Sequence, residues 1–151
     1  MEKQNKQEAK SHSLTSEFTP YEQALELKRL GFDEPCFGFY DESLYFPNNE
    51  NQYGTFCNQK IDAPSCSAPL YQQAFRWFRE KHNWQHSIEP TADQHRFEVG
   101  YNYWVWNSKT GEEYHTMSKN RPTGDWEYET YEEAEQACLK KLIEIVKGGN
   151  K

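Results

Sequence analysis

The chain has 151 residues, a net charge of −7 and 27% charged side chains, and this length is sufficient for one folded domain with a buried core. The negative charge argues against nonspecific nucleic-acid binding, which requires clustered Lys and Arg. Aromatic residues make up 16% of the sequence, whereas disordered chains are poor in aromatics. We therefore expect a folded domain whose core depends largely on Tyr, Trp and Phe rings.

Residues 1–16 are polar, lack apolar periodicity and predict a mobile tail, and residues 17–148 predict a single domain. The N-terminus has no apolar stretch of the kind found in signal peptides, and no apolar run is long enough to span a bilayer. We therefore expect a cytoplasmic protein with free thiols and no membrane association.

The first helix is predicted to begin at Thr19, which would form a capping box with Glu22 while Pro20 takes the first helical position. Gly31 suits the position just after the helix, where a left-handed backbone conformation is common. Phe32 can then pack back onto the last helical turn, as in a Schellman cap.

Residues 36–40 and 44–46 are rich in aromatics and predict a short hairpin. Residues 47–68 then predict a long connection, and a loop of that length inside a compact domain is either functional or partly mobile. A second helix is predicted to begin near Pro69 and to end at Asn83. Its wide apolar stripe indicates burial on two sides.

Residues 97–106 show the clearest strand pattern, and a loop at residues 108–111 leads into a second strand. In this register Trp106 faces Glu113 and Trp104 faces His115. The polar face then carries Arg96, Glu98, Asn102, Trp104, Trp106 and His115. The opposite face carries Phe97, Val99, Tyr101, Tyr103, Val105 and Tyr114. A slip of one residue would exchange the faces of the second strand.

Residues 126–128 predict a third strand, and the capping box of Thr130 with Glu133 predicts the start of a last helix that ends at Gly148-Gly149. One side of this helix carries an apolar stripe, formed by Ala134, Cys138, Leu142 and Ile145. Together the elements predict the α+β class: a small antiparallel sheet packed against a C-terminal helix, with two further helices and a short N-terminal hairpin.

A metal site is the sharpest chemical hypothesis. His82 and His86 are four residues apart, and Cys57 and Cys66 precede them, so the four could form a tetrahedral zinc set. Eight residues separate the two cysteines, however, whereas compact zinc sites use about two to four. We therefore predict no metal site.

The sequence gives little support to catalysis. No pattern places Cys36 or another nucleophile beside a histidine and an acid, as nucleophilic catalysis requires. Cys138 lies on an apolar helical stripe, which is typical of an inert buried thiol. No glycine-rich loop of the phosphate-binding type precedes a helix. We predict no catalytic residue and no cofactor.

The best candidates for a binding site are Trp104, Trp106, Asn102 and His115, which share one predicted sheet face. Two tryptophans two residues apart form a rigid platform for a partner or a planar ligand. The alternative is that the second helix covers this face and makes it part of the core. Both interpretations are compatible with the sequence.

Residues 30–40, 68–81 and 131–146 together resemble small uncharacterised proteins encoded by bacterial genomes and their phages. The resemblance extends over most of the chain from Thr19 onward. It implies a cytosolic setting and a phage or prophage origin, and it carries no activity, cofactor or site residue with it.

These observations favour a non-enzymatic binding protein that acts through protein contacts. The resemblance adds the expectation of a phage or prophage accessory factor that acts on a host protein. The alternative is a binder of a small planar ligand, such as a nucleotide, in an aromatic pocket. An enzyme of unknown class is the third hypothesis.

Overall fold

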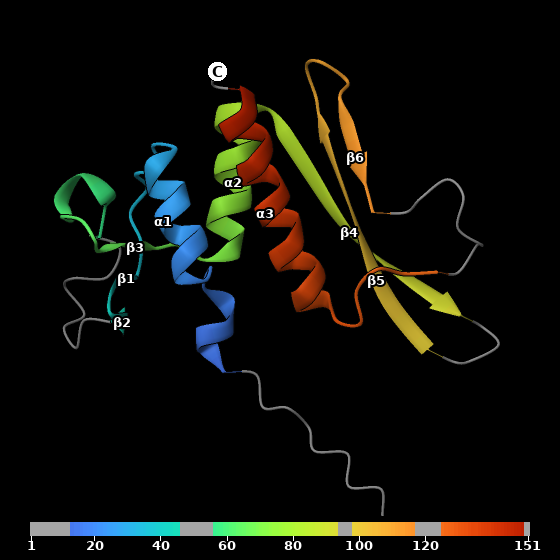
Figure 1. Ribbon diagram of the computed structural model, residues 1–151, viewed down its shortest axis with the longest axis horizontal. Coiled ribbons are helices and arrows are strands. Elements are labelled where there is room, and N and C mark those ends of the chain that lie inside the picture. The colour runs from blue at the N-terminus through green and yellow to red at the C-terminus, as the bar shows by residue number, and fades with distance from the viewer. Residues whose placement is uncertain (1–12, 46–55, 94–97, 117–124, 150–151) are drawn as a thin grey trace, which may run out of the picture.

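The computed structural model describes residues 13–45, 56–93, 98–116 and 125–149. Within these ranges the chain forms three α-helices and two three-stranded antiparallel sheets, which confirms the predicted α+β class. Figure 1 shows one sheet at each end of an elongated molecule, with the helices between them.

The helices are α1 (Tyr21–Arg29), α2 (Tyr71–His82) and α3 (Tyr131–Gly149). The first sheet has the order β2-β1-β3 and contains β1 (Gly38–Asp41), β2 (Ser43–Tyr45) and β3 (Cys66–Ala68). The second sheet has the order β4-β5-β6 and contains β4 (Trp84–Asp93), β5 (Glu98–Asn107) and β6 (Glu113–His115). Two short 3-10 helices are η1 (Leu14–Glu17) and η3 (Asn58–Lys60). No helix in the described ranges has the length and apolar character needed to cross a membrane.

The start of the chain lies partly outside the described residues. The tail was predicted for residues 1–16, of which 1–12 are not described. Leu14–Glu17 form η1, whose side chains are exposed. Phe18, directly after η1, is buried and pairs with Leu70 through an isolated antiparallel bridge. Among the described residues, burial begins at Phe18.

The first helix ends as predicted but begins differently. The N–H of Phe32 donates to the carbonyl of Leu27 at 2.9 Å, and Gly31 has a φ of 94°, so the Schellman cap is confirmed. The predicted capping box is wrong, because α1 begins after Pro20 and no side chain caps it. The hydroxyl of Thr19 is buried without a hydrogen-bond partner in the described part of the chain.

The first sheet contains one strand that was not predicted. The β1–β2 hairpin is confirmed, and Glu42 takes the positive φ of 59° in its turn. The strand β3 lies inside the stretch assigned to a long connection, and it pairs with β1 through Tyr40 and Cys66. β3 has only three residues, all buried, so it lacks the alternation that predicts a strand.

The second sheet confirms the predicted register of the β5–β6 hairpin. Trp106 pairs with Glu113, and Trp104 pairs with His115. The expected third strand at residues 126–128 is wrong, because only Tyr128 forms an isolated bridge, to Tyr101. The third strand is instead β4, which pairs with β5 along ten residues and was not predicted.

The helices α2 and α3 both lie on one side of the second sheet, as Figure 1 shows. From α2, the ring of Phe75 stacks on His86 of β4 at 3.8 Å. From α3, the ammonium of Lys141 lies 4.5 Å from the ring centre of Tyr114. His86 and Tyr114 both stand opposite Val105, and residues directly opposite each other share a face of the sheet. Both helices therefore pack on the face that contains Val105.

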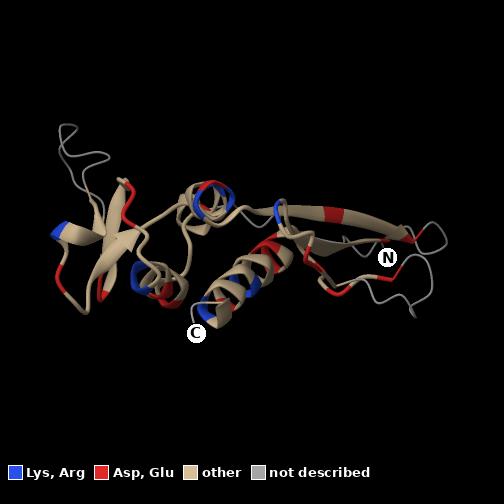
Figure 2. Cartoon of the chain, turned by 90° about the horizontal axis from the view of Figure 1, so that it is seen from above, with Lys and Arg blue, Asp and Glu red and all other residues tan. Residues whose placement is uncertain are grey.

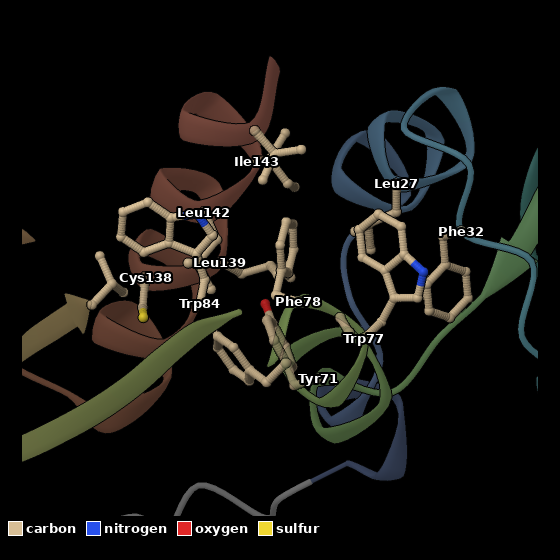
Figure 3. Packing of buried hydrophobic residues seen from close by; sticks show 14 of the residues in the cluster. Leu27, Phe32, Tyr71, Trp77, Phe78, Trp84, Cys138, Leu139, Leu142 and Ile143 are labelled. Atoms are coloured by element: carbon tan, nitrogen blue, oxygen red, sulfur yellow. The ribbon is translucent and has the colours of Figure 1, made fainter. Parts of the chain in front are cut away.

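The main hydrophobic core joins the three helices to this face of the sheet (Figure 3). Its largest fully buried side chains include Phe32, Phe75, Phe78, Leu27, Leu139, Leu142 and Val105. Burial of each such side chain contributes about 1.5–3 kcal/mol of transfer free energy. Outside this core, an ion pair of 2.6 Å between Glu26 and Lys147 joins α1 to the last turns of α3.

The ends of the other two helices follow the sequence signals. α2 ends at Asn83, which has a left-handed φ of 61°. At the start of α3, the N–H of Glu133 donates to the Thr130 hydroxyl at 3.2 Å, and the N–H of Thr130 donates to the Glu133 carboxylate at 3.3 Å. The predicted capping box of α3 is therefore confirmed.

β4 is an edge strand in the described part of the chain, because it pairs only with β5. Opposite Pro90 stands Tyr101, whose N–H and C=O bond to Tyr128 on the far side of β5. In an antiparallel pair, such residues direct their backbone groups away from each other. The nitrogen of Pro90 therefore faces the outer edge of the sheet.

Candidate functional site

The side of the second sheet that faces away from α2 and α3 is here called the helix-free face. The alternation of side chains along each strand assigns residues to this face. From β4 it contains Gln85, Ser87, Glu89, Thr91 and Asp93; from β5 it contains Glu98, Gly100, Asn102, Trp104 and Trp106; and from β6 it contains Glu113 and His115. All four predicted binding residues thus lie on one face.

Three of the four predicted residues form a continuous row of rings. The ring centres of Trp104 and Trp106 are 4.4 Å apart, and the ring of His115 stacks on Trp104 at 4.9 Å with 15° between the planes. Trp104 and Trp106 are half-buried. Since Trp106 has a ring contact only with Trp104 among the described residues, it is one end of this row.

The indole N–H of Trp104 is buried and has no hydrogen-bond partner in the described part of the chain. An unsatisfied buried donor of this kind costs about 1–3 kcal/mol. Trp104 is therefore held by ring stacking and not by a polar contact within the described residues. The alternative that α2 covers these rings is wrong, because α2 contacts the opposite face through Phe75.

Asn102 lies beside this row but has a structural position. It is 2% exposed, and its side-chain nitrogen donates to the Thr91 hydroxyl and to the backbone carbonyl of Asp125. Its side-chain oxygen accepts from the Thr116 hydroxyl and from the N–H of Glu127. The amide is thus fully occupied within the chain, which corrects the prediction that Asn102 contacts a ligand.

Residues 125–127 lie beside β5 at this position, next to the Tyr128 bridge to Tyr101, and cover one end of the helix-free face. The ring of Trp126 packs on Gly100 so closely that a Cβ atom at Gly100 would lie 1.9 Å from Cγ of Trp126. A glycine in a strand often marks such a close approach. Residues 125–127 therefore cover Gly100 and Asn102, and they divide the face into a covered end and the end that contains the tryptophan row.

Within the described strands, the charged Asp, Glu, Lys and Arg residues of the helix-free face are all acidic. Arg96, which the sequence also placed on this face, lies outside the described residues. β4, β5 and β6 contain no Lys or Arg. Their acidic residues all lie on this face, and they are Glu89, Asp93, Glu98 and Glu113. Figure 2 shows red without blue along β4. The tryptophan row therefore lies in a field that favours cations.

Two carboxylates stand closest to the row. Glu113 pairs directly with Trp106, has a side chain that is 53% exposed, and places Oε1 3.7 Å from Nε2 of His115. Glu89 accepts a hydrogen bond of 3.3 Å from Ser87. The hairpin register alone was sufficient to identify Glu113, since it placed this residue opposite Trp106. Glu89 could not be found without β4.

The residues of the considered zinc set are distributed over several elements. His86 stacks on Phe75, and Cys66 is buried in the first sheet. Among the described residues, no group of three or more His, Cys, Asp or Glu side chains is arranged to hold a metal ion. Burial raises the pKa of Cys66 to about 11 and that of Cys36 to about 12, so both thiols are protonated near neutral pH and are weak nucleophiles.

A cavity of about 600 Å³ lies on the helix side, between the end of α3 and the β5–β6 hairpin. Its lining includes Trp84, Tyr114, Lys141 and His82. The Tyr114 hydroxyl donates to Glu112 at 2.6 Å while Lys141 lies over the Tyr114 ring. Burial lowers the pKa of His82, which favours the neutral imidazole. This cavity was not foreseen, because its walls include the unpredicted β4.

No protein-family model, curated protein or solved structure matches this chain.

Proposed function

We propose that this chain is a non-enzymatic binding protein that docks a protein partner at the tryptophan row of the helix-free face. The observation that carries the proposal is that both α2 and α3 pack on the other face, which leaves Trp104 and Trp106 half-buried on a side that no described helix covers. Tryptophan is enriched among the residues that dominate binding energies at protein interfaces. Aromatic side chains ringed by polar groups are typical of contact sites.

The chemistry of the described residues supports binding more than catalysis. The buried thiols of Cys36, Cys66 and Cys138 have pKa values raised by burial. The row itself contains two indoles and one imidazole, and Trp104 and Trp106 offer surface and stacking, not proton transfer. Stacked aromatic side chains supply contact area with little loss of conformational entropy.

The proposal includes a biological setting that comes from the sequence resemblance alone. In this setting the chain is a phage or prophage accessory factor, and the partner is a protein of the bacterial host. The test below therefore uses bacterial lysate as the source of the partner.

The proposal can be tested by affinity capture with matched variants. The wild-type chain, Trp106→Ala and Phe37→Ala would be immobilised in parallel, because Phe37 is 46% exposed but lies next to the first sheet. A partner retained by the wild type and by Phe37→Ala but lost by Trp106→Ala supports the proposal. Oxidative footprinting of the complex should also show protection of Trp106. Equal retention by Trp106→Ala would refute it.

A second candidate function is the binding of a small planar ligand in the cavity lined by Trp84 and Tyr114. A volume of about 600 Å³ lies within the range of ordinary ligand sites. A flat ligand would have to displace Lys141 from the Tyr114 ring to stack there. Native mass spectrometry of the purified chain distinguishes the two, since a retained small molecule would favour this candidate.

A further inference from the structure

We infer that the partner presents an arginine or lysine side chain to the ring of Trp106, beside the carboxylate of Glu113. This inference rests on the proposed function and specifies the chemistry of its partner. It makes the helix-free face a receptor for a basic protein segment.

The first argument is the charge of the surface. The strands β4, β5 and β6 contain no Lys or Arg, and their four acidic residues all lie on the helix-free face. The whole chain has a net charge of −7. An acidic partner or a nucleic acid would be repelled, whereas a basic segment would be attracted and oriented.

The second argument is the geometry around Trp106. Glu113 stands directly opposite it on β6, and side chains opposite each other in an antiparallel pair have Cβ atoms about 4.5–5.5 Å apart. A cation over the Trp106 ring would therefore lie within reach of the Glu113 carboxylate. Tryptophan is the aromatic residue that binds cations most strongly. Among the described residues, Glu113 has no Lys or Arg partner of its own.

The third argument is that a cation already packs on an aromatic ring of this hairpin elsewhere in the molecule. On the helix side, the ammonium of Lys141 lies 4.5 Å from the centre of the Tyr114 ring, and the Tyr114 hydroxyl is bonded to the carboxylate of Glu112. Ring and carboxylate belong to neighbouring positions on the same hairpin in both cases. At Trp106 and Glu113 the chain supplies the ring and the carboxylate, and the partner supplies the cation.

Two other occupants fit less well. A purely apolar partner would bury the Glu113 carboxylate without a compensating charge, which is strongly unfavourable. A second copy of this chain, docked face to face, would bring Glu89 and Glu113 against the same acids of its partner, and like charges across an interface are destabilising.

The test uses four synthetic peptides of equal length, with arginine, lysine, citrulline or glutamate at the same positions. Citrulline retains the shape of arginine but carries no charge. Binding would be followed by tryptophan fluorescence at low and high salt. We expect the arginine and lysine peptides to bind, the citrulline and glutamate peptides to bind at least about tenfold more weakly, and the affinity of the basic peptides to fall with salt.

Three variants at the proposed site and two control variants localise the effect. Trp106→Ala and Glu113→Gln should each weaken binding of the arginine peptide by about three- to tenfold, and Trp106→Phe should weaken it less because it keeps a ring. Glu22→Gln, which changes an exposed acid in α1, and Phe37→Ala should leave binding unchanged. Unfolding midpoints would establish that every variant is folded.

The outcomes separate this inference from the proposed function. Equal binding of the citrulline and arginine peptides, no binding of any peptide, or an unaltered affinity in Glu113→Gln would overturn the inference. The proposed function would survive if capture of the host protein still required Trp106 but was unaffected by salt and by Glu113→Gln. If Trp106→Ala retained the host protein at every salt concentration, the proposed function itself would fail.

Discussion

The imidazole of His86 lies flat against the ring of Phe75, with ring centres 3.8 Å apart and 9° between the planes. This stack joins the first half of β4 to α2 and helps to place α2 on the same face of the sheet as α3. Burial, and secondarily the positive charge of Arg79, lowers the pKa of His86 to about 4. The folded chain therefore holds His86 as a neutral imidazole near neutral pH.

This pKa predicts a specific acid sensitivity. Because the pKa of His86 is lower in the folded state than in the unfolded state, its contribution is present above about pH 6.5 and is lost as the pH falls towards about 4. His86→Phe keeps a flat ring without the titration. Urea unfolding from pH 7 to pH 4 should show the wild type losing about 1–3 kcal/mol relative to His86→Phe. If the free energy of unfolding changed with pH in the same way in the wild type and in His86→Phe, this prediction would be refuted.

Glu135 predicts the opposite dependence. Its pKa is raised to about 7, first by burial and then by the nearby charges of Glu17 and Glu132. A raised carboxyl pKa gives stability that is present below about pH 4.5 and is lost as the pH rises through about 7. Glu135→Gln should therefore stabilise the fold by about 1–3 kcal/mol near pH 8 and have little effect near pH 4. Thermal unfolding at both pH values would measure this, and stabilisation at the acidic pH alone would contradict it.

The contact between Gly100 and Trp126 predicts that β5 tolerates no side chain at this position. A Cβ atom in Gly100→Ala would lie 1.9 Å from Trp126, so Trp126 must shift, at a cost of about 1–3 kcal/mol. Gly148→Ala is the matched control, because no atom lies within 4 Å of its new Cβ and alanine favours a helix. Chemical denaturation of both variants tests this, and equal stability of the two would contradict the close packing.

Packing of α3 on the sheet can be tested at two positions of its stripe. Leu142 is 1% exposed in the main core, and Leu142→Ala should destabilise the chain by about 2–5 kcal/mol. Ile145 is only partly buried at the margin of that core, so Ile145→Ala should have a smaller effect. Urea titration of the two variants gives the comparison. A loss below about 0.5 kcal/mol at Leu142 would show that α3 is peripheral.

Local signals predicted most of the helices and one hairpin. The Schellman cap at Gly31 and Phe32 and the capping box of Thr130 and Glu133 depend on a few neighbouring residues, and the structure contains both. Thr19 shows the limit of such signals. Its sequence suits a capping box, yet its N–H donates to the carbonyl of Pro69 and its side chain is buried. Tertiary packing at this position overrides the local preference.

The strands that could not be predicted have weak or misleading patterns. In β4 the side chains that face the helices include His86 and Pro90 beside Trp84 and Ile88, so polar and apolar residues do not alternate cleanly. β3 has three residues and no alternation. Trp126 suggested a strand by its alternation with acids, but it serves to cover Gly100.

In the candidate site, too, local features could be predicted and features that depend on distant segments could not. The β5–β6 register is local, so it correctly placed Trp104, Trp106 and His115 on one face. The position of Asn102 depends on residues 125–127, which are distant in sequence and bond to its side chain. Asn102 has four hydrogen-bond partners from three segments, yet its sequence context is the same as that of an asparagine exposed to solvent. No local sequence pattern distinguishes a buried, hydrogen-bonded asparagine from an exposed one.

Pro90 has a consequence for how the protein behaves at high concentration. An edge strand of ten residues is a template on which further strands can add, and repeated addition leads to fibrillar aggregates. The ring of Pro90 removes one backbone donor from the outer edge and occupies the space that an incoming strand would need. The chain can therefore present an aromatic sheet face to a partner while the outer edge of β4, unpaired among the described residues, resists growth into a stack of molecules.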